Sequence, residues 1–173
     1  MKSALSVLVS AALLAGCAAM GGASGPTATA NLEPTRGNSV GGKVAFEQRG
    51  PNIRVSGTIT GLKSGGENGF HVHEKGDCSS GDGMSAGGHF NPAGKGHGHY
   101  GGAERHAGDL PNLRADAYGT ASFSFETSGI AIGSGAADIV GKGLIVHRDP
   151  DDYKSQPAGN AGPRIACAVI ARS

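Results

Sequence analysis

The stretch Asn52-Ile-Arg-Val-Ser-Gly-Thr-Ile59 shows most clearly how this chain folds. Ile53, Val55 and Ile59 alternate with arginine, serine and threonine, which is the two-residue period of a strand with one buried face. The segment 120–126 repeats the pattern, with alanine and two phenylalanines on the apolar side. No helix of ordinary length is indicated, so the sequence predicts a fold built from strands.

Short strand-like runs, separated by Gly, Pro and Asn, continue through the whole chain. The expected strands are Thr27–Leu32, Gly42–Glu47, Asn52–Ile59, Gly69–Val72, Arg114–Ala117, Thr120–Glu126, Gly143–His147 and Ile165–Ile170. Several short strands with turn signals between them favour an all-β sandwich or barrel.

The composition fits one modest domain. The chain has 173 residues, 32 glycines and no tryptophan, so its apolar core is small and its backbone turns often. The part from 31 to 173 has the length of a single domain. The formal net charge is +1 and basic runs are lacking in the sequence, which gives no reason to expect a nucleic-acid partner.

The first residues have the pattern of an export signal. Lys2 precedes a short uncharged apolar run, so residues 1–16 are expected to be a signal peptide rather than a membrane span. The run ends in Leu14-Ala-Gly-Cys17, which resembles the lipobox of bacterial lipoproteins, in which the cysteine is acylated. Residues 17–30, mostly Gly, Ala, Ser and Thr, are then expected to form a flexible tether.

This interpretation places the protein in the bacterial periplasm or cell envelope, anchored to a membrane through lipidated Cys17. An aspartate after the cysteine often favours inner-membrane retention, so Ala18 favours the outer membrane. The alternative is an ordinary signal peptide with an incidental cysteine. If Cys17 carries lipid, Cys78 and Cys167 remain as the only possible internal pair, and an oxidising compartment would preserve their disulfide.

Histidines and one aspartate are spaced like metal ligands in the second half of the chain. The set is too large for one ion and suits two, because copper and zinc readily take imidazole and carboxylate ligands. Its members are His71, His73, His89, His97, His106, Asp109 and His147. We therefore expect one site that holds two metal ions.

Two long segments, 74–112 and 148–163, show almost no hydrophobic periodicity. Loops beyond about 12–15 residues are uncommon in compact domains unless they are functional or disordered. Four of the expected ligands lie in the first segment, so metal coordination and the cysteine bridge are the forces available to order it. The second segment follows His147 and is expected to cover the same site.

Local spacing divides the ligands into two sets. His71 and His73 are two apart in an expected strand, so their side chains leave the same face, with Cβ atoms roughly 7 Å apart. The second set, inside the long loop, consists of His97, His106 and Asp109. His89 lies between the sets in sequence, and its two ring nitrogens could bind one metal on each side.

Four separated motifs, in order between about Asn31 and Ala171, make the chain recognisable. They are Gly69-Phe-His-Val-His-Glu-Lys-Gly-Asp-Cys78, Gly88-His-Phe-Asn-Pro92, His106-Ala-Gly-Asp-Leu110 and Gly159-Asn-Ala-Gly-Pro-Arg-Ile-Ala-Cys167. These motifs closely resemble copper/zinc superoxide dismutase. The resemblance implies an all-β, eight-stranded antiparallel Greek-key β-sandwich or barrel with two long functional loops, over a domain spanning 31–173, with one copper and one zinc ion per subunit.

Matched by motif, the resemblance implies two ligand sets that share the ring of His89 as a bridging imidazolate. The copper ligands are His71, His73, His89 and His147, and the zinc ligands are His89, His97, His106 and Asp109. Asp151 sits where the family has a carboxylate that links a copper histidine to a zinc histidine. Arg164 matches the active-site arginine that attracts superoxide, and Cys78 and Cys167 match the family's disulfide.

The implied reaction is the dismutation of superoxide to dioxygen and hydrogen peroxide. Copper alternates between Cu(II) and Cu(I), zinc does no redox chemistry, and the ring of His89 detaches, gains a proton and delivers it. The stretch between His147 and Arg164 lacks the acidic and basic guiding cluster of the familiar animal enzymes. Lys75 and Lys154 are left as weak candidates for substrate guidance.

Two other functions would use all or some of the same ligands. A lipid-anchored copper or zinc buffer would need the ligands, but neither a bridging histidine nor Arg164. A degenerate single-metal relative would lack zinc ligands, and all of them are present. The resemblance leaves open whether the protein is a monomer or a homodimer. His99, an extra histidine beside the zinc set, is expected to be a solvated loop residue.

Overall fold

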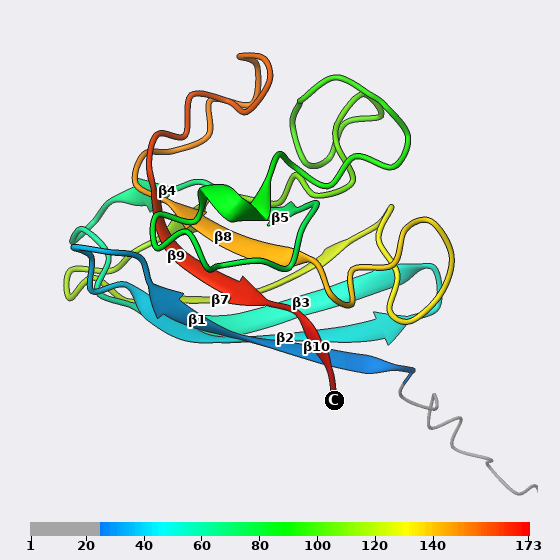
Figure 1. Ribbon diagram of the computed structural model, residues 1–173, viewed down its shortest axis with the longest axis horizontal. Helices are drawn as coiled ribbons and strands as arrows, with labels where there is room; N and C mark the ends of the chain where they lie inside the picture. Colours follow the sequence, from blue (N-terminus) through cyan, green and yellow to red (C-terminus); the bar gives the residue numbers. More distant parts are fainter. Residues whose placement is uncertain (1–24) are drawn as a thin grey trace, which may run out of the picture.

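A computed structural model describes residues 25–173, so the expected signal peptide, Cys17 and residues 17–24 of the expected tether lie outside the described residues. The described part is almost entirely β-structure (Figure 1). Its strands are β1 (Thr27–Pro34), β2 (Gly41–Arg49), β3 (Asn52–Thr60), β4 (Glu67–Asn68), β5 (Phe70–His73), β6 (Leu113–Arg114), β7 (Ala121–Thr127), β8 (Gly143–His147), β9 (Arg164–Val169) and β10 (Ala171–Arg172). A one-turn 3-10 helix, η1 (Met84–Ala86), follows β5.

Eight of these strands form one antiparallel sheet that curves into a half-barrel. The strand order is β5-β8-β9-β1-β2-β3-β7, and β10 also pairs with β1. β1 is the turning point, because its residues Thr27–Leu32 pair with β2 while Glu33 and Pro34 pair with β9. β5, β8 and β9 therefore lie over the layer of β1, β2, β3 and β7, as Figure 1 shows. β4 and β6 form a separate two-stranded sheet.

The hydrophobic core lies between these two layers. Phe46 and Val55 enter it from β2 and β3, and Phe70 and Leu144 enter it from β5 and β8; all four are fully buried. The ring of Phe70 meets the ring of Phe123 on β7 edge to face, with 5.5 Å between the centroids. This contact joins the two layers directly.

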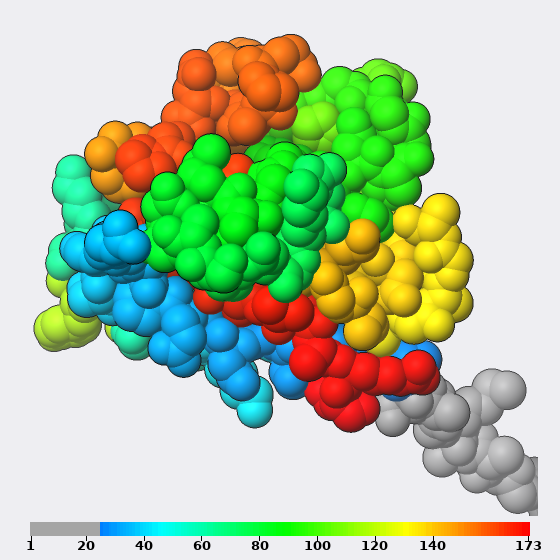
Figure 2. All heavy atoms as spheres, in the orientation of Figure 1, coloured from blue at the N-terminus to red at the C-terminus, as the bar shows by residue number. Residues whose placement is uncertain are grey.

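Strand β5 places apolar and histidine side chains on opposite faces. Phe70 and Val72 belong to the core, whereas His71 and His73 point to the other face and are still almost completely buried. Two long loops, 74–112 and 148–163, cover that outer face. In Figure 2 they are the green and orange segments that lie above the blue and red strands. The outer face of β5 is thus both polar and closed to solvent.

A disulfide ties the first long loop to β9. Cys78 and Cys167, 89 residues apart, are joined, which confirms the pairing expected from the cysteine count and the motif. In the chain-entropy model a closed loop of this length contributes about 4–5 kcal/mol to the free energy of unfolding. The disulfide packs with Ala86 and Ile145 in a small apolar cluster on the outer face of β8, which fixes η1 against the sheet.

The expected all-β antiparallel class is confirmed, and seven expected strands occur within a few residues of their predicted bounds. The expected strand Arg114–Ala117 is wrong, because only Leu113–Arg114 pair. The carboxylate of Asp116 accepts the backbone N–H groups of Tyr118 and Thr120, and this turn ends the strand. β4 and β10 were not expected, since two-residue strands leave no periodicity to detect.

The boundary between the expected tether and the domain also needs correction. β1 begins at Thr27, so residues 27–30, which fell both in the expected tether and in the expected strand Thr27–Leu32, belong to the sheet. Ala28 and Ala30 are buried, and with Leu32 they alternate along the core face of β1. Small residues that resemble a linker in composition serve here as core side chains.

Candidate metal centre

The seven expected metal ligands lie together between the outer face of β5 and the two long loops. His71 and His73 come from β5, His147 ends β8, and the other four come from the loop 74–112. They form two groups, and within each group the ligand atoms all lie within 4.8 Å of one another. Cluster 1 consists of His71, His73, His89 and His147, and cluster 2 consists of His89, His97, His106 and Asp109. All seven side chains are buried.

Two histidines of cluster 1 present unprotonated nitrogens to each other. The Nδ1 atom of His73 donates to the carbonyl of Gly87 at 2.9 Å, and that of His147 donates likewise to Gly162 at 3.0 Å. Each neutral ring therefore keeps its lone pair on Nε2, and the two Nε2 atoms face each other at 3.4 Å. Burial lowers the pKa of His147 to about 3 and that of His73 well below 6.5, which disfavours a proton between them. A metal cation fits this position.

Three further ring nitrogens are buried without a hydrogen-bond partner among the described residues. They are Nδ1 of His71, Nε2 of His89 and Nδ1 of His106. Buried polar atoms in folded proteins nearly always have a partner, so each of these atoms calls for an explanation. Metal coordination would satisfy all three, and the residues present therefore fit the two ions.

Asp109 organises cluster 2. Its Oδ1 atom lies 2.8 Å from Nδ1 of His89, 3.1 Å from Nδ1 of His97 and 3.5 Å from Nδ1 of His106. Its Oδ2 atom accepts the backbone N–H groups of His106 and Gly98. Burial alone would raise the pKa of Asp109, but the three neighbouring histidines, two of them hydrogen-bonded to its side chain, hold it well below its usual range. Three imidazoles and one carboxylate suit a four-coordinate zinc ion.

The ring of His89 belongs to both clusters. Its Nδ1 atom faces Asp109, while its Nε2 atom is on the side of cluster 1. The ring centroid of His89 lies 4.0 Å from that of His71 and 5.0 Å from that of His73. An imidazole that offers one nitrogen to each cluster meets the requirement for a ring shared by two metals. The structure brings all seven expected ligands together, and their individual roles as copper and zinc ligands stay predictions.

Asp151 links the two clusters by a second route. Its buried carboxylate lies 2.8 Å from Nε2 of His71 through Oδ2 and 2.9 Å from Nε2 of His97 through Oδ1. Asn112 holds the backbone of Asp151 from both sides, because its amide donates to the Asp151 carbonyl and accepts the Asp151 N–H, each at 3.0 Å. Gly159, at φ +64°, packs against this carboxylate, where any side chain would overlap it. The position agrees with the linking role expected for Asp151.

Sequence reasoning missed two amides that position ligands. The side chain of Gln156 accepts the backbone N–H of His97 at 2.9 Å and donates to the His97 carbonyl at 2.8 Å, which joins the two long loops at a cluster 2 ligand. The buried amide of Asn68 donates to the carbonyls of His147 and Arg148, both at 2.9 Å. Neither residue type ligates copper or zinc readily, so nothing in the sequence singled them out.

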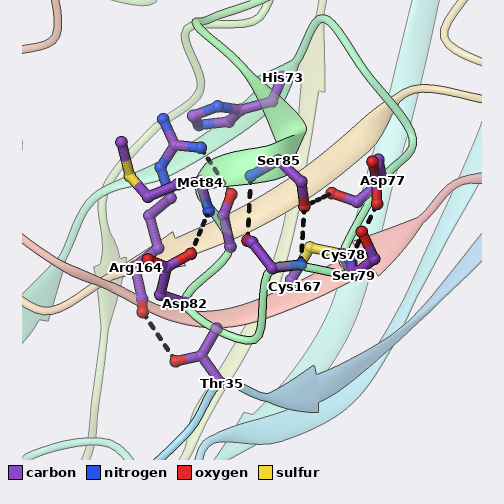
Figure 3. The surroundings of a disulfide bond; sticks show 12 residues. Thr35, His73, Asp77, Cys78, Ser79, Asp82, Met84, Ser85, Arg164 and Cys167 are labelled. Carbon is purple, nitrogen blue, oxygen red and sulfur yellow. Dashed lines mark hydrogen bonds between the residues drawn. A yellow bond between two sulfur atoms is a disulfide. The ribbon is translucent and has the colours of Figure 1, made fainter.

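Arg164 lies beside cluster 1. Its guanidinium donates to the carbonyls of Gly83 and Gly87, both at 2.6 Å. The Gly87 carbonyl oxygen also accepts a hydrogen bond from Nδ1 of His73, so Arg164 and His73 are both hydrogen-bonded to this one atom. Figure 3 shows the guanidinium next to the ring of His73, above η1 and the Cys78–Cys167 disulfide. The structure therefore places Arg164 where the sequence analysis expects it.

The remaining expected residues lie apart from the two clusters. Lys75 and Lys154 are exposed on the two long loops. His99 is exposed. Its ring stacks on that of Tyr100, with 4.3 Å between the centroids, and lies near the ring of Tyr153, with 4.8 Å between the centroids. It belongs to neither cluster. This placement agrees with the solvated loop role expected for His99.

The protonation of His97 predicts a pH dependence for zinc uptake. Burial lowers the pKa of His97, but hydrogen bonds to Asp109 and Asp151 outweigh burial and raise it to about 9. Protonated His97 thus stabilises the metal-free fold fully below pH about 6.5, and this stabilisation is lost as the pH rises through about 9. Because zinc must displace that proton, we predict that zinc affinity rises about tenfold per pH unit up to about pH 9 and then levels off.

Competition with a chromophoric chelator between pH 6 and 10 measures this affinity. Asp151→Asn is the control, because it removes one carboxylate that holds the His97 proton and should move the plateau to lower pH. Zinc affinity that is already constant above about pH 6.5 in the unaltered protein would contradict the raised pKa.

Comparison with known proteins places the chain in a family. Residues 40–170 match the family described as copper/zinc superoxide dismutase (SODC). A curated relative named superoxide dismutase (Cu-Zn), from Paramecium bursaria Chlorella virus 1, is 44% identical over 137 residues, which cover 76% of this chain and 72% of the relative. The crystal structure of the clock protein EA4 is similar with a TM-score of 0.77 and 41% identity, covering 84% of this chain and 93% of that chain.

The matched region contains both metal clusters, the disulfide and Arg164. Buried imidazole nitrogens and one carboxylate that converge on two centres are the chemistry that such a family requires. The chain therefore belongs to the copper/zinc superoxide dismutase family, and its enzymatic activity and its two metal cofactors are those of that family.

Proposed function

We propose that this enzyme dismutes superoxide at cluster 1, while cluster 2 is a structural centre that holds the shared ring in place. The observation that carries the proposal is the position of His89, which offers Nε2 to cluster 1 and Nδ1 to cluster 2. When bound, copper supplies one-electron transfer by alternating between Cu(II) and Cu(I), and zinc supplies positive charge and geometry without redox chemistry.

Proton delivery is assigned to His89. Two superoxide anions and two protons give one dioxygen and one hydrogen peroxide, and protons are needed because a peroxide dianion is a very poor leaving species. The Nε2 atom of His89 is buried on the side of cluster 1 without a hydrogen-bond partner among the described residues, so it is free to carry a proton and pass it to a more basic peroxide oxygen. Asp109, 2.8 Å from the Nδ1 atom of the same ring, keeps that ring oriented during the transfer.

Substrate attraction is assigned to Arg164. A guanidinium stays charged at every physiological pH, and a cation beside cluster 1 raises the local concentration of a small anion. Two backbone carbonyls, of Gly83 and Gly87, hold the charge in place without neutralising it. Among the described residues, salt bridges connect other arginines to carboxylates but do not include Arg164.

A metal buffer is the less favoured function. A buffer needs ligands of suitable affinity, but it gains nothing from a ring placed between two clusters or from a cation fixed beside one of them. The family match favours the enzymatic function over the buffer function, because the curated relative is named as a superoxide dismutase.

The location proposed for the enzyme is the bacterial cell envelope, where it would remove extracytoplasmic superoxide. Support comes from the export-type pattern of residues 1–16, the lipobox-like Cys17, and a disulfide that an oxidising compartment would preserve. None of the described residues forms a helix long and apolar enough to cross a membrane. A homodimer is compatible with the family and is left to measurement of the molecular mass in solution.

Replacing Arg164 tests substrate attraction. We predict that Arg164→Ala lowers the rate constant at low ionic strength by about tenfold, and that the loss shrinks as salt is added. Copper content should be unchanged, because Arg164 donates to carbonyls and not to a cluster residue. Pulse radiolysis at several ionic strengths gives the rate constants.

Two matched variants sharpen the Arg164 test. Arg164→Lys keeps the charge and should retain part of the rate. Arg148→Ala removes an equal charge from an exposed arginine that pairs with Asp149, so it should change the rate less than twofold. Equal losses in Arg164→Ala and Arg148→Ala would show that only net charge matters and would refute a local role.

Replacing Cys17 tests the lipid anchor. In a bacterial host supplied with labelled palmitate, the full chain should carry label and sediment with membranes. Cys17→Ser should lose both while its dismutase activity is retained, because the described domain does not include residue 17. Unlabelled full chain in the soluble periplasmic fraction would support an ordinary signal peptide instead.

A further inference from the structure

The strand that carries Arg164 contains an irregularity beside the active centre. Along β8 and β9, Val146 pairs with Ala166, but His147 pairs with Arg164, so Ile165 is an extra residue without a partner on β8. Such a β-bulge re-aims the side chains next to it and must be held, because its backbone groups leave the ladder. His147 of cluster 1 and Arg164 both lie at this bulge.

A single residue from another part of the chain holds the bulge. Thr35, directly after β1, donates its backbone N–H to the carbonyl of Ile165 at 3.1 Å. Its hydroxyl donates to the carbonyl of Arg164 at 2.8 Å, as the dashed line in Figure 3 shows. The backbone bond continues the β1–β9 register, in which Glu33 pairs with Cys167 and Pro34 with Ala166. The hydroxyl bond goes beyond that register, because it reaches the carbonyl of Arg164 on the other side of the extra residue.

The hydroxyl of Thr35 is itself oriented. Asn38 donates its side-chain N–H to Oγ1 of Thr35 at 2.8 Å, which leaves the hydroxyl proton for the Arg164 carbonyl. The Thr35 methyl group packs near Gly83, whose carbonyl accepts the guanidinium of Arg164. Arg164 is thus fixed at both ends, by Thr35 at its backbone and by Gly83 and Gly87 at its guanidinium.

We propose that Thr35 is a positioning residue, which sets the place of the Arg164 guanidinium over cluster 1 by locking the β-bulge. The inference rests on the role proposed above for Arg164. A rotation of about 10° at the Arg164 Cα would move the end of this long side chain by about 1 Å, enough to weaken a short-range attraction. Losing the hydroxyl would leave the Arg164 carbonyl without its donor and release that rotation.

The experiment uses azide as a small anionic probe of the copper- and zinc-loaded enzyme. The azide dissociation constant comes from the change in the copper absorption spectrum, and the dismutation rate constant comes from pulse radiolysis. For Thr35→Val, which keeps the shape and loses the hydroxyl, we expect the azide dissociation constant to rise about fivefold and the low-salt rate constant to fall about threefold. Thr35→Ser, which keeps the hydroxyl, should stay within about twofold of the unaltered enzyme in both measurements.

Thr127→Val is the matched control. Thr127 ends β7, is buried to the same 7% exposure as Thr35, and donates its hydroxyl to the carbonyl of Ser128, which also accepts Arg105; it makes no hydrogen bond to Arg164 or to a cluster 1 residue. The Thr127→Val variant should have a lower free energy of unfolding but the same azide dissociation constant as the unaltered enzyme. An equal change in azide affinity for Thr127→Val and Thr35→Val would mean that general loosening is the cause, and would overturn the proposal.

Arg164→Ala separates failure of this inference from failure of the proposed function. If Arg164→Ala weakens azide binding and Thr35→Val does not, the role of Thr35 is overturned and that of Arg164 stands. If Arg164→Ala leaves azide binding unchanged, both roles are overturned.

Should Thr35→Val fail to fold, Asn38→Ala decides the matter, because Asn38 is exposed and acts only on the orientation of the Thr35 hydroxyl and the turn. It should raise the azide dissociation constant about twofold. An unchanged constant in this folded variant would overturn the proposal.

Discussion

Buried imidazoles whose free nitrogens converge impose the main constraint on this structure. In cluster 1 the Nε2 atoms of His73 and His147 face each other at 3.4 Å, while burial lowers the pKa values of both rings and keeps protons away. A cation between these nitrogens would satisfy both lone pairs. The loops that cover it have few apolar side chains, so they depend on the same coordination and hydrogen bonds for their order.

Both the sheet and the long loops contribute ligands to the site. β5 and β8 supply three imidazoles from a rigid, doubly buried pair of strands, and the loop 74–112 supplies the remaining ligands. Cross-links then connect the parts: the Cys78–Cys167 disulfide fixes the loop to β9, and Asp151 joins His71 to His97. The Gly87 carbonyl ties the arginine beside cluster 1 to a ligand of that cluster.

Alternating residues and ligand spacing predicted much of this molecule, because strands and metal sites both leave local patterns. The period of Ile53–Ile59 and the motifs around His71 and Asp109 are examples. The positioning groups left no such pattern. Gln156 and Thr35 act through hydrogen bonds to backbone atoms far away in sequence, and those contacts exist only once the sheet has formed. Residues 27–30 fitted both a tether by composition and a strand by pattern, since alanines occur in linkers as well as in cores, and the structure shows the strand.

The central claim is that one imidazole, that of His89, connects two different metals. A crystal structure of the fully loaded enzyme, with anomalous data at the copper and zinc edges, tests it most directly. We predict copper near Nε2 and zinc near Nδ1 of the same ring, with metal–nitrogen distances of about 2.0–2.1 Å. Two centres without a common ring, or a single occupied centre in protein loaded with both metals, would contradict the account.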